Sequence, residues 1–184
     1  AKVSAVPLCN SDYTLGEKIF YAVKATREAV SCNTNLGIIL LCAPLIQAIY
    51  NKQSAFTLRQ SLSEVLTNTT VQDAEWVFKA IMLASPGGLG SSDEQDVTEE
   101  PSVNLTEAMR LASVKDRIAL QYITDYQDIF DFAVLVYYNG LNRFGIEKWA
   151  AVFVYASLLS QYPDSHIERK YGSQYTEFIS SRMS

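Results

Sequence analysis

The segment from Cys32 to Gly37, "CNTNLG", places a thiol, two amides and a hydroxyl directly before an apolar helical segment. Thr34 and Asn35 are residue types that favour the N-cap of a helix, so we expect a helix to begin there. The N–H groups of its first turn and its dipole would favour an anion, and Gly37 would let a ligand approach the backbone. The alternative is an ordinary capped helix whose glycine serves packing, which is the commoner arrangement.

A glycine-rich and acidic segment, "SPGGLGSSDEQDVTEE", begins at residue 85. Gly87 and Gly88 could form a nest of N–H donors for phosphate, or simply a helix C-cap followed by a turn. The segment is not a P-loop, because no Gly-Lys-Ser/Thr follows the glycines. Among the acidic residues behind them, Glu94 and Asp96 are the candidates for holding Mg²⁺ through carboxylate oxygens. A merely solvated acidic loop is the alternative.

A third polar segment, "PDSHIERKYG", covers residues 163–172 and gathers Asp164, His166, Arg169 and Lys170. A carboxylate beside two cations suits a phosphorylated sugar, since the cations hold phosphate while the acid orients or deprotonates a hydroxyl. A surface turn whose basic residues complement a helix dipole is the alternative. His166 is the only histidine, so a histidine-rich metal site is excluded.

Helical periodicity dominates the segments that must position these residues. In residues 15–30, Ile19, Ala22 and Val23 share one face, while charged residues, Lys18 among them, occupy the others. Thr57 with Gln60 and Thr70 with Asp73 have the spacing of capping boxes. The pattern predicts an all-α, single-domain bundle over residues 1–184, with seven or eight helices and one long loop rich in glycine and acid. The expected helical ranges are 15–30, 35–50, 57–66, 70–85, 105–122, 126–144, 146–162 and 173–183.

Composition narrows the class of protein. A chain of 184 residues, 48% of them hydrophobic, can bury about 70% of the surface of its unfolded form. The net charge of −5 gives a nucleic-acid partner no support. No window reaches the roughly 18 uninterrupted apolar residues of a membrane span, and no signal peptide is recognisable. We therefore expect a cytoplasmic protein without a membrane partner; the sequence permits a homo-oligomer without specifying one.

Together, "CNTNLG", "SPGGLG" and "DSHIERKYG" on an all-helical chain resemble the triphosphoribosyl-dephospho-coenzyme A synthase family. The branch found in one-carbon-metabolising microbes is the most similar, and the resemblance extends from about Gly16 to Gly172. It implies an all-α transferase that binds an ATP-like nucleotide and dephospho-CoA or a similar acceptor. Adenine is released and a triphosphoribosyl group remains on the acceptor. Such a transfer needs a carboxylate for the hydroxyl proton, with cations or Mg²⁺ for the triphosphate.

The resemblance also implies roles for particular residues. Asp164 is the catalytic candidate, and Glu94 and Asp96 are the candidates for Mg²⁺. Asn33, Thr34 and Gly37 match the family segment "NTHKG", which is expected to hold phosphate or ribose. The full set of expected substrate-binding residues is Asn33, Thr34, Asn35, Gly37, Gly87, Gly88, His166, Arg169 and Lys170.

Two features depart from the family pattern. Asn35 stands where the family has histidine, and Leu36 where it has lysine. The family also carries more chain upstream, so we expect this chain to be the C-terminal two-thirds of a longer one. Loss of a lysine from a polyphosphate site favours an alternative, a non-catalytic helical module that binds a nucleotide or a partner protein.

Overall fold

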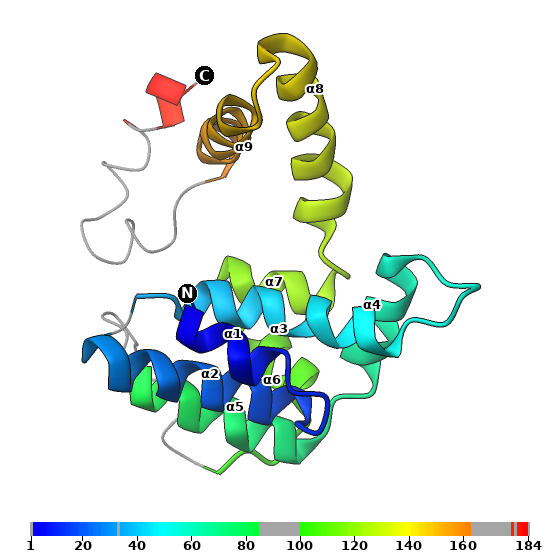
Figure 1. The fold of residues 1–184 in the computed structure, drawn as a ribbon, viewed down its shortest axis with the longest axis vertical. Coiled ribbons are helices and arrows are strands. Elements are labelled where there is room, and N and C mark those ends of the chain that lie inside the picture. Colours follow the sequence, from blue (N-terminus) through cyan, green and yellow to red (C-terminus); the bar gives the residue numbers. More distant parts are fainter. Residues whose placement is uncertain (1, 33, 85–99, 163–177, 179, 184) are drawn as a thin grey trace. The chain divides into compact units, whose positions relative to one another are not determined.

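The computed structural model describes residues 2–32, 34–84, 100–162, 178 and 180–183. These residues include nine α-helices and one π-helical segment, and no strand occurs among them, which confirms the all-α class (Figure 1). Two compact units divide the chain, Ala1–Asp125 and Tyr126–Ser184. Within the described ranges, no helix is long and apolar enough to cross a membrane.

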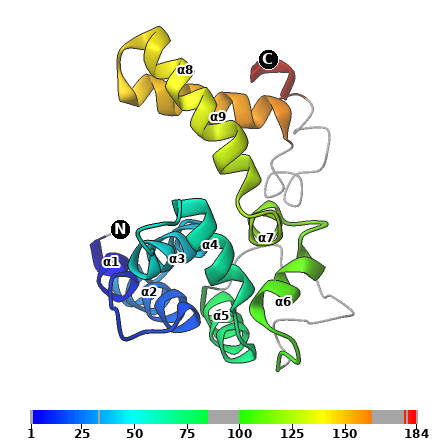
Figure 2. The same ribbon diagram turned by 90° about the vertical axis from the view of Figure 1, so that its right-hand side faces the viewer.

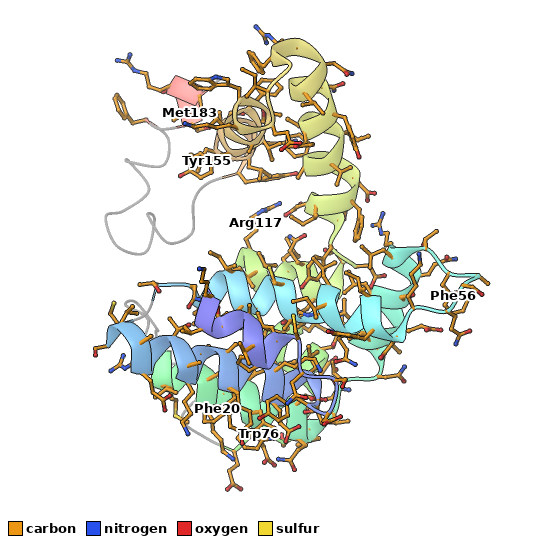
Figure 3. The ribbon with its side chains drawn as sticks, viewed as in Figure 1. Phe20, Phe56, Trp76, Arg117, Tyr155 and Met183 are labelled. Carbon is orange, nitrogen blue, oxygen red and sulfur yellow. The ribbon has the colours of Figure 1, made fainter. Side chains whose placement is uncertain are left out.

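The first unit is built around α2 (Leu15–Val30), which packs against α1 (Lys2–Leu8), α3 (Leu36–Asn51) and α5 (Val71–Ala84). Ile19 and Ala22 of α2 are fully buried, as the periodicity predicts. Phe20 of α2 and Trp76 of α5 lie ring to ring with 5.0 Å between their centroids (Figure 3). Further contacts pair α3 with α4 and α6 with α7, and α5 also contacts α6. The helices are α1 Lys2–Leu8, α2 Leu15–Val30, α3 Leu36–Asn51, α4 Leu58–Thr67, α5 Val71–Ala84, α6 Leu105–Ala112 and α7 Arg117–Ile123.

Capping residues define where several of these helices begin. The predicted box at α4 is formed, because the Thr57 hydroxyl accepts from the Gln60 N–H and the Gln60 side chain accepts from the Thr57 N–H. The predicted box at α5 is formed too. There the Asp73 N–H donates to Thr70 Oγ1 at 3.1 Å, and the Thr70 N–H donates to Asp73 Oδ2 at 2.9 Å. Each box satisfies donors that the first helical turn leaves unpaired.

Pro44 lies inside α3 and changes the hydrogen bonding of that helix. Proline has no N–H, so the carbonyl of Leu40, four residues earlier, lacks its usual intrahelical donor. The hydroxyl of Tyr122 on α7 donates to that carbonyl at 2.7 Å. Tyr122 is almost completely buried, and burial raises the pKa of its hydroxyl far above the ordinary value. The phenol therefore stays a donor, and it replaces the missing backbone N–H while joining α3 to α7.

The structure corrects three sequence predictions for the first unit. The single helix predicted over 105–122 is divided into α6 and α7, because the Asp116 carboxylate accepts from the N–H groups of Ile118 and Ala119 and starts a new helix. The N-terminal helix α1 is absent from the prediction. Lys18, predicted on a polar face, is fully buried.

The second unit contains a helical hairpin. It comprises the π-helical segment η1 Asp128–Ala133, α8 Val134–Phe144 and α9 Glu147–Gln161, and Figure 2 shows α8 and α9 crossing. Gly145 ends α8 with φ +65°, a conformation that favours glycine. Asp125 and Tyr126 before η1 also have positive φ, 49° and 57°. The helix predicted to begin at residue 126 therefore begins at Asp128.

Candidate functional site

Only one of the three predicted site segments lies mainly within the described residues. Thr34, Asn35 and Gly37 are described, and all three lie at the start of α3. The structure therefore gives the neighbours and hydrogen bonds of these three residues. The other predicted site residues lie outside the described ranges: Asn33, Gly87, Gly88, Glu94, Asp96, Asp164, His166, Arg169 and Lys170.

Asn35 precedes α3 and points its amide toward the neighbouring helices. Its Nδ2 donates to Ser4 Oγ of α1 at 3.3 Å and to Thr26 Oγ1 of α2 at 3.2 Å. Thr26 in turn donates to the Ala22 carbonyl at 3.0 Å. The Asn35 side chain makes no capping hydrogen bond to α3. Its amide thus fixes the start of α3 against α1 and α2, a structural role; a role in binding substrate stays a prediction.

Gly37 lies close to α7. A Cβ at this position would come within 2.8 Å of Ile118 Cδ1, much closer than a normal carbon–carbon contact. The atom it would meet is the flexible end of a side chain rather than backbone. The packing interpretation of this glycine therefore has direct support, while close approach of a ligand to its backbone remains a prediction. Thr34, one residue before Asn35, is exposed to solvent.

A buried carboxylate joins the first turns of two other helices in the same unit. Asp73 Oδ1 accepts from the Gly16 N–H of α2 at 2.8 Å, and Oδ2 accepts from the N–H and hydroxyl of Thr70 at 2.9 and 2.7 Å. A Cβ on Gly16 would lie 2.7 Å from both Cα and the carbonyl oxygen of Asp73. Sequence reasoning found the Thr70 capping box but missed the contact with Gly16, because no local pattern links residues 57 positions apart.

Lys18 is a buried cation that sequence reasoning also missed. Its Nζ donates to the carbonyls of Asn10 and Tyr13, both at 2.6 Å. Burial lowers the pKa of this ammonium below its ordinary value, and Glu17 and Asp12 partly oppose the shift. Both bonds hold the turn between α1 and α2, so Lys18 stabilises that turn.

Within the ranges that the structure covers, no group of three His, Cys, Asp or Glu side chains could hold a metal ion. Cys42 is partly buried, and burial raises the pKa of its thiol, so its sulfur is less available as a thiolate ligand or nucleophile. The predicted Mg²⁺ residues Glu94 and Asp96 lie outside these ranges.

Comparison with known proteins places the chain in a family. The family model of CitG, ATP:dephospho-CoA triphosphoribosyl transferase, matches residues 2–184. A crystal structure of an Archaeoglobus fulgidus protein described as a triphosphoribosyl-dephospho-coA synthase has the same fold, with a TM-score of 0.74 and 23% sequence identity. The match covers 99% of this chain and 78% of that one. No curated protein matches the chain.

The family match confirms the resemblance drawn from the three sequence motifs and the transferase class that it implied, and the solved structure confirms the fold. Neither comparison favours the alternative of a non-catalytic module. The chain belongs to the CitG family of ATP:dephospho-CoA triphosphoribosyl transferases.

Proposed function

We propose that this protein transfers a triphosphoribosyl group from ATP to dephospho-CoA and releases adenine. The observation that carries the proposal is the family match, which extends over residues 2–184. The all-α fold agrees with it. We place the reaction in the cytoplasm, where ATP is abundant.

The proposed step is a glycosyl transfer. The bond between the ribose anomeric carbon and adenine breaks, and adenine leaves with the bonding electron pair and takes up a proton. The acceptor hydroxyl of dephospho-CoA forms the new carbon–oxygen bond and gives its proton to a carboxylate. Asp164 is the residue that we propose as this base, and the start of α3, with Asn33 and Thr34, is the segment that we propose for phosphate or ribose.

Mg²⁺ is proposed as the companion of the triphosphate, because a divalent cation neutralises polyphosphate charge. The described residues supply no three-ligand site for it. Glu94 and Asp96 are the residues that we propose would hold it through their carboxylate oxygens.

The test is a direct assay of adenine release. Full-length protein is incubated with ATP, Mg²⁺ and dephospho-CoA, adenine is measured by chromatography, and the product is identified by its mass. We expect adenine and a triphosphoribosyl adduct in equal amounts. Asp164→Asn should lower the rate by about 100-fold or more, whereas the matched control Asp12→Asn, at an exposed position, should leave it unchanged.

Two results would overturn the proposal or part of it. Folded protein that binds ATP but releases no adenine would support the non-catalytic module instead. Full activity in Asp164→Asn would remove Asp164 from the reaction while leaving the transferase assignment intact.

A further inference from the structure

A second polar site lies at the other end of α3, where that helix meets α4 and the first turns of α2 and α5. The structure contains a pocket there of about 220 Å³. Its polar lining includes Gln47 and Asn51 of α3, Ser61 and Glu64 of α4, and Asp73 of α5. None of these positions belongs to the three motifs described above. Only Asp73 already has a structural role, its bonds to Gly16 and Thr70.

Two of the residues that line this pocket each have a buried polar atom without a hydrogen-bond partner in the protein. These atoms are Ser61 Oγ and Gln47 Oε1. Ser61 retains only 1% of its surface exposed. Gln47 donates its Nε2 to Asn51 Oδ1 at 3.1 Å, which turns Oε1 away as an unpaired acceptor. Leaving buried polar atoms unpaired is costly, and native proteins rarely do so without a reason.

The charge of the pocket indicates which ligands fit it. Its lining residues include the carboxylates of Glu64 and Asp73 but no lysine, arginine or histidine. Both oxygens of Asp73 already accept hydrogen bonds from Gly16 and Thr70. Gln47 Oε1 and Ser61 Oγ have no partner, and Glu64 adds a second carboxylate. A phosphate would meet negative charge and find no cation, whereas an N–H donor would find acceptors.

The pocket is separate from the predicted phosphate segment. Gln47 follows Gly37 by ten residues of the same helix, which corresponds to about 15 Å at about 1.5 Å per residue. A small molecule held by Gln47 and Ser61 therefore cannot also contact the start of α3.

We propose that this pocket binds a small neutral or cationic molecule through an amino group. Gln47 Oε1 and Ser61 Oγ accept its N–H groups, and Glu64 interacts with any positive charge. An aminated heterocycle such as adenine and an alkylammonium ion share this chemistry. The proposal does not depend on the transferase activity, because it rests on the unpaired atoms and the charge of the pocket.

The experiment is an NMR titration of the ¹⁵N-labelled full chain, following the side-chain amide signals of Gln47 and Asn51. The probes are adenine and ethylammonium chloride, with sodium pyrophosphate as the anionic control. We expect at least one amine to shift these signals in a saturable way and pyrophosphate to leave them unchanged. Saturation by adenine alone identifies a heterocycle site, and saturation by ethylammonium a cation site.

Two variants on the same helix test the atoms directly. Ser61→Ala should weaken amine binding about 10-fold, and should raise Tm by about 2–4 °C because it removes a buried unpaired hydroxyl. The control Ser63→Ala, whose side chain does not line this pocket, should change neither. The proposal is overturned if no amine binds, if pyrophosphate saturates the signals, if Ser61→Ala binds amines normally, or if it lowers Tm. The last result would mean that the hydroxyl already has a stabilising partner such as a fixed water.

Discussion

The hydrogen bond between Tyr122 and the Leu40 carbonyl leads to a quantitative prediction. Tyr122→Phe removes the hydroxyl, and because Pro44 has no N–H, the Leu40 carbonyl is left without either donor. The bond lies in the buried interior, where water cannot replace it. An unpaired buried carbonyl costs about 1–3 kcal/mol. For a chain of this size, a loss of about 2 kcal/mol corresponds to a fall in Tm of roughly 4–8 °C.

A double-mutant cycle separates this effect from general loss of packing. Pro44→Ala restores an N–H at position 44, which can donate to Leu40 along the helix. In that background, Tyr122→Phe should cost at least about 1 kcal/mol less than in the wild type, since the carbonyl keeps a partner. The control Tyr50→Phe removes an exposed hydroxyl that donates to the Cys9 carbonyl at 3.0 Å, and water can replace it, so little change is expected.

The assay should report on the first unit alone. Trp76 lies in that unit and Trp149 in the other, so urea unfolding followed by tryptophan fluorescence in a Trp149→Phe background isolates the signal of Trp76. If Tyr122→Phe costs the same with and without Pro44→Ala, the reasoning is refuted, because the hydroxyl would then not be replacing the missing N–H.

The remaining predictions concern backbone fit and charge. Gly16→Ala should destabilise the fold by about 3 kcal/mol in urea unfolding, because its Cβ would meet the Asp73 backbone. Gly37→Ala should cost less than about 1 kcal/mol, since only the end of Ile118 must move; similar costs for both would contradict this. Ser31→Gly should raise Tm by about 2–4 °C and Gly145→Ala should lower it, because both positions have φ near +60°. Opposite shifts would disprove the assignment of strain. Burial lowers the Lys18 pKa in the folded chain below its ordinary value of 10.5. At pH values between the lowered pKa and 10.5, the unfolded chain therefore binds more protons than the folded chain. The stability of wild type relative to Lys18→Met should therefore rise with pH through that window and stay flat below it; a decrease in urea midpoints over the same range would exclude this linkage.

Much of the fold could be predicted from local pattern. Helical periodicity predicts the all-α class, and the capping boxes at Thr57 and Thr70 predict where α4 and α5 begin. The break between α6 and α7 was missed because Asp116 can either continue a helix or cap one, and the spacing alone does not decide between them. Lys18 was missed because its burial depends on two carbonyls that the preceding turn supplies.

The candidate site was less accessible to sequence reasoning. Asn35 is a residue type that favours the N-cap, yet its side-chain amide donates hydrogen bonds to Ser4 of α1 and Thr26 of α2. Those partners are distant along the chain and carry no motif. The pocket of Ser61 and Gln47 has no sequence signal at all, since an unpaired buried atom is recognisable only once the neighbouring helices are in place.

The bond from Gly16 to Asp73 also bears on the order in which this protein folds. It closes a segment of 57 residues, whereas Lys18 closes one of only 8 with Asn10. Each doubling of a loop adds about 0.6 kcal/mol to the entropy cost of closure, so the longer contact costs about 2 kcal/mol more to form. The α1–α2 turn should therefore form early and the α2–α5 crossing late. Substitutions at Lys18 should then slow folding, while substitutions at Gly16 should mainly speed unfolding.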